Sequence, residues 1–131
     1  MKACVFDTGA LVQYFADNDQ MRELFQRIGK STLQGMVPMP ILSELYYKTC
    51  QKLGNEVARV RYVALRNSNL SFVGLEDNSV MEAGRIKCQY SFTSLADSFA
   101  AGLALLEKCP LVTTDGGLAE VKGLKIIKIS F

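Results

Sequence analysis

Apolar or small residues fill almost every position of the stretch 95–106, which only Ser98 and Asp97 interrupt. An apolar surface on every side is typical of a buried helix. We therefore expect Asp97 near the start of a core helix, where a carboxylate costs free energy unless another group compensates its charge. The pattern continues into a short buried strand at 111–113, and Asp115 follows that strand. In an α/β fold, a helix start and a strand end lie on the same edge of the sheet.

The rest of the chain alternates between short apolar runs, which predict strands, and stretches with apolar residues three and four positions apart, which predict helices. Strands are expected at 2–6, 32–37, 70–75, 111–113 and 125–129. Helices are expected at 10–16 after a Thr8-Gly9 turn, from residue 18 or 19 to 29, at 40–53, at 55–67, from residue 77 or 78 through 86, and at 95–106, with a short helical turn after Gly116-Gly117.

This alternation predicts one α/β domain over residues 1–131, with a central parallel sheet of about five strands and helices on both faces. Right-handed crossovers place the strand ends and the following helix starts on one edge of such a sheet. Asp7 ends the first strand and Asp115 follows the fourth, whereas Glu44 and Asp97 lie in the first turns of their helices. We expect all four acids at that edge.

Each acid also has a structural interpretation. Asp97, three residues after Ser94, fits the outline of a capping box, and Glu44 near a helix start is favoured by the helix dipole. Asp7 and Asp115 precede turns, where aspartate is common.

As a group, the four acids favour a functional interpretation. Carboxylates about 4 Å apart repel by roughly 1–4 kcal/mol per pair, so a cluster persists only with retained protons or a bound cation. Oxygen ligands alone favour Mg²⁺ or Mn²⁺. Glu76 and Asp77 compete for such a role, but their apolar neighbours are fewer, and we interpret them as a helix cap.

The composition limits which catalytic mechanisms are possible. The chain carries a formal net charge of +2 and contains no histidine and no tryptophan. Serine–histidine and cysteine–histidine hydrolysis are therefore excluded, which leaves carboxylates, a perturbed Lys, Tyr or Cys, or metal-bound water for acid–base work. The four scattered cysteines predict reduced thiols in a cytoplasmic protein. Residues 1–6 are too short for a signal peptide, and no apolar run reaches the roughly 18 residues of a membrane span.

Basic side chains gather in the two helices at 40–53 and 55–67, and between Lys48 and Arg66 only Glu56 opposes their charge. The candidates for RNA phosphate contacts are Lys48, Lys52, Arg59, Arg61 and Arg66. The same pattern is equally consistent with a solvated helical face. Tyr46 and Tyr47 are candidates for base stacking, although packing in the core or in a dimer interface is favoured. In the second helix we expect these residues to face inward: Val57, Val60, Val63, Ala64 and Leu65.

Four segments, in this order and spacing, resemble the PIN domain of VapC-type toxins: VFDTGAL at 5–11, PILSEL at 40–45, SLADSFAAGLAL at 94–105 and PLVTTD at 110–115. The resemblance covers essentially the whole chain. It implies a three-layer PIN-like fold and a Mg²⁺- or Mn²⁺-dependent endoribonuclease that acts on RNA. Its metal-binding acids are then Asp7, Glu44, Asp97 and Asp115, with Thr8 and Thr113 supporting the site. The resemblance also implies a homodimer and an antitoxin protein as inhibitory partner.

Two positions depart from the family pattern. Gly9 stands where the family usually has Ser or Asn, and Gly116-Gly117-Leu118 stands where many members have a further acid. These departures support an alternative, a catalytically silent PIN-like module that binds RNA or a protein partner. A phosphotransfer receiver or aspartate-nucleophile phosphatase ranks last, because no second aspartate follows Asp7. Neither a Walker sequence nor a GxGxxG loop is present for nucleotide binding.

Overall fold

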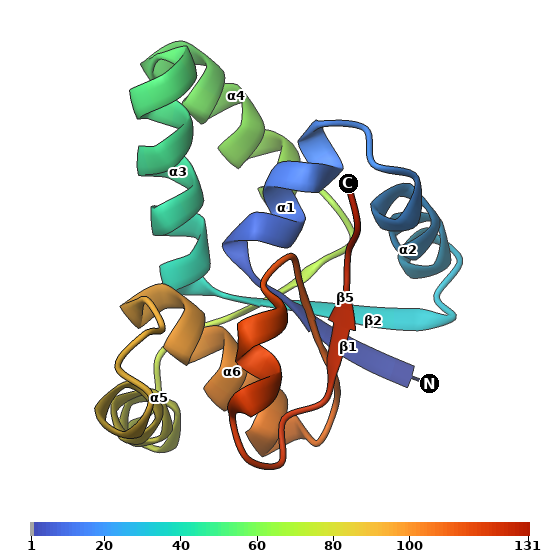
Figure 1. Ribbon diagram of the computed structural model, residues 1–131. Helices are drawn as coiled ribbons and strands as arrows, with labels where there is room; N and C mark the ends of the chain where they lie inside the picture. The colour runs from blue at the N-terminus through green and yellow to red at the C-terminus, as the bar shows by residue number, and fades with distance from the viewer. Residues whose placement is uncertain (1) are drawn as a thin grey trace.

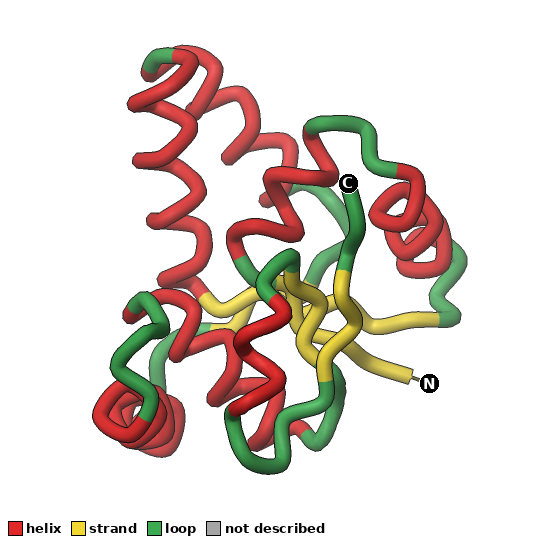
Figure 2. Tube along the Cα trace, viewed as in Figure 1, coloured by secondary structure: helices red, strands yellow, loops and turns green. Residues whose placement is uncertain are grey.

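The computed structural model is a three-layer α/β fold around one parallel sheet, and it describes residues 2–131 (Figures 1 and 2). Met1 of the predicted domain lies outside the described residues. The strands are β1 (Lys2–Phe6), β2 (Leu33–Pro38), β3 (Ser71–Val73), β4 (Leu111–Thr113) and β5 (Ile126–Lys128). The helices are α1 (Thr8–Phe15), α2 (Asp19–Gly29), α3 (Met39–Leu53), α4 (Asn55–Arg66), α5 (Asp77–Gln89) and α6 (Leu95–Glu107), and a 3₁₀ turn, η1, spans Gly116–Glu120.

The sheet has the strand order β3-β2-β1-β4-β5, and every pair of neighbours is parallel. Helices α1 and α2 lie on one side of it, α5 and α6 lie on the other, and α3 and α4 form an antiparallel hairpin (Figure 1). This confirms the predicted fold class and all five strands, although β3 and β5 are shorter than expected. Within residues 2–131, no helix is both long and apolar enough to cross a membrane.

A glycine inside β2 marks close packing rather than a break in the strand. A Cβ atom built on Gly35 would lie 2.6 Å from Cδ1 of Ile28 and 2.9 Å from Cε2 of Phe6. Glycine weakens a strand but permits this close approach of other groups to the backbone. The predicted strand at 32–37 is therefore confirmed, and its least strand-like residue is required by the layer packed against it.

The predicted Thr8-Gly9 turn is wrong, because these residues form the first turn of α1. Asp7 is the N-cap residue of that helix, and its Oδ1 atom accepts a 2.9 Å hydrogen bond from the backbone N–H of Ala10. Aspartate is among the preferred N-cap residues because its carboxylate satisfies an otherwise unpaired helix amide. The strand end and the helix start thus meet at a single residue, Asp7.

Two other predicted helix starts differ in outcome. Of the two residues at which α2 was expected to begin, Asn18 is the cap, and it accepts a hydrogen bond of 3.2 Å from the backbone N–H of Met21. The α5 helix is capped by Glu76, one of the two acids interpreted as a helix cap, and not by Asp77 or Asn78, since the Ser79 hydroxyl accepts a 3.0 Å hydrogen bond from the Glu76 N–H. The serine at the third position of the helix thus determines which residue acts as the N-cap.

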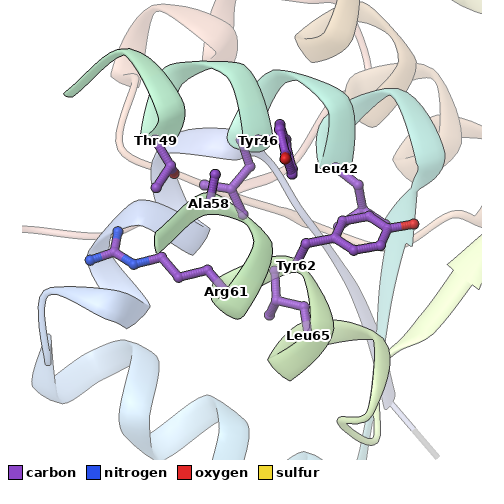
Figure 3. Close-up of a pocket in the computed structure, with 8 residues that line it drawn as sticks. Leu42, Tyr46, Thr49, Ala58, Arg61, Tyr62 and Leu65 are labelled. Carbon is purple, nitrogen blue, oxygen red and sulfur yellow. The ribbon is translucent and has the colours of Figure 1, made fainter. Parts of the chain in front are cut away.

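The prediction for the inward face of α4 is wrong at four of its five residues. Leu65 is buried, but Val57, Val60 and Val63 are 36%, 64% and 55% exposed, and Ala64 is also exposed. The helix packs on α3 through another face, which carries Ala58, Tyr62 and Leu65 (Figure 3). The space between the two helices has no room for a water molecule. Two apolar stripes share this helix, and tertiary packing covers only one of them.

The predicted core helix α6 is buried along most of its length. Ala100, Ala101 and Ala104 are fully or almost fully buried, whereas Leu95 and Leu106 at its two ends are 59% and 40% exposed. Small residues let it approach α5 closely, and Ser94 caps it by accepting a 3.0 Å hydrogen bond from the Asp97 N–H. The helix start, and with it Asp97, is thereby fixed at the edge of the sheet.

Candidate functional site

The four predicted acids come from four elements that end or begin at the carboxyl edge of the sheet. Asp7 follows β1 and Asp115 follows β4, and these strands are neighbours with Phe6 paired to Val112. Asp115 caps η1, where its Oδ1 atom accepts a 2.8 Å hydrogen bond from the Gly117 N–H.

The other two acids arrive from helices that contact each other, α3 and α6. Glu44 is 6% exposed and lies beyond the first turn of α3, contrary to the prediction, because this helix begins at Met39. Asp97 lies in the first turn of α6, as predicted. The charge of Glu44 is close enough to raise the pKa of Asp97, and the charge of Asp115 raises it further. Asp97 therefore lies within electrostatic reach of each of the other three acids.

Asp7 is the most deeply buried of the strand-end acids, with 2% of its surface exposed. Burial raises the pKa of its carboxyl group to about 7, although hydrogen bonds from the Thr113 side chain and the Ala10 backbone act in the opposite direction. The negative charges of Asp97 and Asp115 raise this pKa a little more. A carboxylate in this position is costly to ionise without a cation.

Burial also disfavours the ionised form of Asp97. Burial, and then the charge of Glu44, raise the pKa of Asp97 to about 6, while Ser94 and Lys48 lower it. Its Oδ1 atom is buried and has no hydrogen-bond partner among the residues that the structure describes, and the same holds for Oγ1 of Thr8. Buried polar atoms are nearly always satisfied, so two unsatisfied oxygens at one edge point to a group that the protein binds there.

Lys48 places a positive charge beside this cluster. Its Nζ atom lies 3.7 Å from Oε1 of Glu44, one helical turn earlier, and its side chain is about half exposed. The sequence pattern indicated RNA contacts for Lys48 but not this ion pair with a predicted metal ligand. Residues four apart on a helix face the same side, which was the available signal.

Thr113 connects two of the strand-end acids. Its Oγ1 atom accepts a 2.9 Å hydrogen bond from the Asp115 N–H, and its side chain hydrogen-bonds to Asp7, which lowers the pKa of that acid. Thr113 is fully buried, as is almost all of Thr8. Both predicted supporting residues thus lie at the edge that carries the acids. Thr114, which the sequence did not single out, lies next to Gly9 in the same place.

The donor chemistry of this edge fits a hard divalent cation. Its candidate ligands are all oxygen atoms, which Mg²⁺ and Mn²⁺ prefer. Within residues 2–131, no three acidic or cysteine side chains already converge as a cation cage. Asp7 and Asp115 each use one oxygen as a helix cap, whereas Oδ1 of Asp97 is unpartnered. Mg²⁺ usually binds through one or two carboxylates and keeps several waters, so an incomplete cage suits it.

Three of the five predicted RNA-contacting cations line one groove. Lys48, Lys52 and Arg61 border a cavity of about 460 Å³ beside α1, α3 and α4, together with apolar Val12 and Leu53. The Arg61 guanidinium lies 4.9 Å from the centre of the Phe15 ring and reaches toward α1 (Figure 3).

The remaining two predicted cations lie elsewhere. Arg66 stacks on Phe72 at 4.9 Å and contacts Met39, on the β3 side of the hairpin. Arg59 is exposed and does not line the groove. The structure therefore divides the basic cluster predicted from sequence into a groove-lining set and two separate residues.

Taken together, the parallel sheet and its acidic edge define an α/β protein with a candidate cation site at the carboxyl ends of the strands. The sequence profile of the PIN domain family matches residues 4–124. The chain therefore belongs to the PIN domain family. A comparison with curated protein sequences found no match.

Solved structures share the fold at low sequence identity. VapBC2 from Rickettsia felis, bound to a DNA fragment from its promoter, is 15% identical with a TM-score of 0.80, covering 98% of this chain and 99% of that one. DNA-bound VapBC from Salmonella typhimurium is 18% identical with a TM-score of 0.77, covering 98% of each chain. Mycobacterium tuberculosis VapC20, a toxin that cleaves the sarcin-ricin loop, is 11% identical with a TM-score of 0.69, covering 91% and 95%.

Proposed function

We propose that this protein is a Mg²⁺- or Mn²⁺-dependent endoribonuclease and the toxin component of a toxin–antitoxin pair. The observation that carries the proposal is the buried, unpartnered Oδ1 atom of Asp97, a carboxylate that the charges of Glu44 and Asp115 also reach. Membership of the PIN domain family and the fold shared with VapC20 support it.

The proposed ligands are the four acids, directly or through water. When bound, a divalent cation offsets the negative charge that develops on the scissile phosphate. Thr113 orients Asp7 and Asp115 through its hydroxyl, and Thr8 offers a second hydroxyl at the same edge. Glu44 either joins the ligands or orients the attacking water. Because the chain has no histidine, proton transfer near neutral pH is assigned to Asp7 and Asp97, whose pKa values burial raises to about 7 and about 6.

RNA is proposed to reach the acids along the basic groove. Lys48 contributes to both the acidic site and the groove, since it pairs with Glu44 and lines the groove with Lys52 and Arg61. Phosphate contacts from such side chains supply most of the nonspecific affinity for nucleic acids. The exposed Arg59 and Arg66 are then peripheral phosphate contacts.

An antitoxin protein is the proposed partner, because several of the matched structures are VapBC complexes. A homodimer is proposed on the same resemblance. The exposed valines of α4 offer an apolar surface that either association can bury. A cytoplasmic location and a single domain spanning residues 1–131 complete the proposal.

The decisive experiment is cleavage of a mixed, structured RNA pool by the wild type and Asp97→Asn, with Mn²⁺ and with EDTA. We expect metal-dependent cleavage that the substitution abolishes. Glu23→Gln, which removes one exposed acid on α2, is the matched control and should cleave normally. Equal inactivity of the wild type and Asp97→Asn with metal present would favour the silent binding module, for which Gly9 and Gly116-Gly117 are the supporting departures.

A further inference from the structure

Gly9 and Thr114 compete for the same small volume beside Asp7. A Cβ atom built on Gly9 would lie less than 3.0 Å from the Thr114 hydroxyl oxygen, closer than real Cβ contacts allow. The same point is 3.7 Å from Oδ1 of Asp7. The Thr114 hydroxyl therefore occupies the place where a side chain at position 9 would begin.

The backbone explains why these distant residues meet. β1 pairs with β4, and the Asp7 N–H donates a 3.2 Å hydrogen bond to the carbonyl of Val112. The residues after each strand consequently run side by side, which places the first turn of α1 next to the segment that carries Thr114. Both Gly9 and Thr114 are partly exposed, so a ligand at this edge can reach them.

Glycine at position 9 is not required by backbone conformation. Among the described glycines, positive φ angles occur at Gly54 and Gly123, and Gly9 has the ordinary conformation of a helical turn. A glycine in a helix is about 1 kcal/mol less favourable than alanine. The feature of this structure that accounts for a glycine here is the space taken by Thr114.

We propose that Thr114 is a positioning residue of the acidic site. Its hydroxyl lies beside Asp7, where the hydroxyl of a serine at position 9 would lie if Thr114 were absent. This inference rests on the proposed metal site and deepens it. The Thr114 hydroxyl is placed to contact a water of a hydrated divalent cation held beside Asp7. The β-branched side chain restricts χ1 and so helps to fix the direction of the hydroxyl.

The proposal can be tested by moving a hydroxyl from position 114 to position 9. This is possible because only the hydroxyl of Thr114, and not the rest of its side chain, would clash with a Cβ atom at position 9. The Cβ atom of Thr114 would lie 3.5 Å from a Cβ at position 9, an ordinary contact. Gly9→Ser combined with Thr114→Ala therefore fits the available space and moves one hydroxyl from the residue that follows β4 to the first turn of α1. Gly9→Ser alone does not fit without displacing Thr114.

The experiment compares the wild type, Thr114→Ala, Thr114→Ser, Gly9→Ser and the Gly9→Ser/Thr114→Ala pair. Mn²⁺ affinity is measured from the shift in the urea unfolding midpoint with metal concentration, and metal-free stability comes from the same curves. We expect Thr114→Ala to weaken Mn²⁺ binding roughly tenfold, as loss of a group that orients a ligand typically does. Thr114→Ser and the double variant should recover most of that affinity.

Gly9→Ser alone should lower metal-free stability, and Thr114→Ala should relieve that loss. Should Gly9→Ser fail to fold, the two Thr114 variants still carry the test. Unchanged Mn²⁺ affinity in Thr114→Ala, or no recovery in the double variant, would overturn the inference. So would a wild type that Mn²⁺ does not stabilise.

RNA cleavage by the same variants is read separately. A wild type that binds Mn²⁺ but cuts no RNA would remove the ribonuclease proposal, while the Mn²⁺ comparison would still decide the role of Thr114.

Discussion

At the carboxyl edge of the sheet the acidic side chains of Asp7 and Glu44 are buried, whereas on the outer face of α4 apolar side chains are exposed. Asp7 is 2% exposed, and Val60 is 64% exposed. Both regions reverse the usual distribution, in which apolar groups are covered and unpaired charges face water. The two regions differ in how much free energy this arrangement costs the folded chain. They therefore also differ in whether they need a binding partner.

The buried acids are the more costly departure. Each pKa unit by which burial raises an acid is worth about 1.4 kcal/mol against its ionised form, whereas a valine left in water forgoes roughly 1.5–3 kcal/mol of burial without creating an uncompensated charge. An exposed valine is also common on protein surfaces. The acidic edge consequently depends on a cation or on retained protons, and the α4 face is tolerated in the free chain.

The largest expected effect is at Asp7. Asp7→Asn should raise the metal-free free energy of unfolding at pH 8 on the order of 2–4 kcal/mol, because it removes the buried charge and leaves an acceptor for the Ala10 N–H. Stabilisation by Mn²⁺ should be largely lost at the same time. Urea unfolding with Mn²⁺ and with EDTA measures both, and Glu23→Gln controls for the loss of one surface acid.

The pH dependence of the same variant tests the cause. The folded pKa of Asp7, about 7, lies above the ordinary 3.8, so the folded state binds more protons than the unfolded state between these values. Metal-free stability of the wild type should therefore fall as pH rises from about 4 to about 7 and lose nothing more from Asp7 above that. Asp7→Asn should show a flatter dependence. A wild-type curve that rises across this range would contradict the assignment of a buried, uncompensated acid.

An intermediate effect is expected in the basic groove of the α3–α4 hairpin. Lys52→Glu should weaken binding of single-stranded RNA several-fold and reduce the slope of log affinity against log salt by about 1. Fluorescence anisotropy in the Asp97→Asn background avoids cleavage during the measurement. Lys2→Glu makes the same charge change at the opposite edge of the sheet and should have little effect. Equal losses in both variants would indicate net charge, not the groove, as the source of affinity.

The smallest effect should come from the exposed face of α4. Val63→Ala should change the free energy of unfolding by less than about 0.5 kcal/mol, because Val63 is 55% exposed. Leu65→Ala, two residues later on the buried face, should cost about 2–5 kcal/mol. Chemical denaturation of the two variants compares the faces directly. Similar losses would mean that the valines are covered in solution, as in a homodimer.

Short apolar runs separated by helical patterns were sufficient to predict the parallel sheet. The placement of Asp7 and Asp115 followed from it, since crossovers of one hand bring the strand ends to one edge. Asn18 and Ser94 were recognisable as helix caps because capping is a local hydrogen bond between residues close in the chain. Local chemistry and the handedness of connections thus determined most of the fold and the location of the candidate site.

Tertiary packing alone decided which apolar stripe of α4 is covered, because periodicity identifies a stripe and not its partner. It also divided the basic cluster, placing Lys48 beside Glu44 and Arg66 against Phe72. The steric conflict between a side chain at position 9 and Thr114 arises only because β1 and β4 lie side by side. Sequence patterns report neighbours along one element, whereas these relations join elements that only the folded chain brings together.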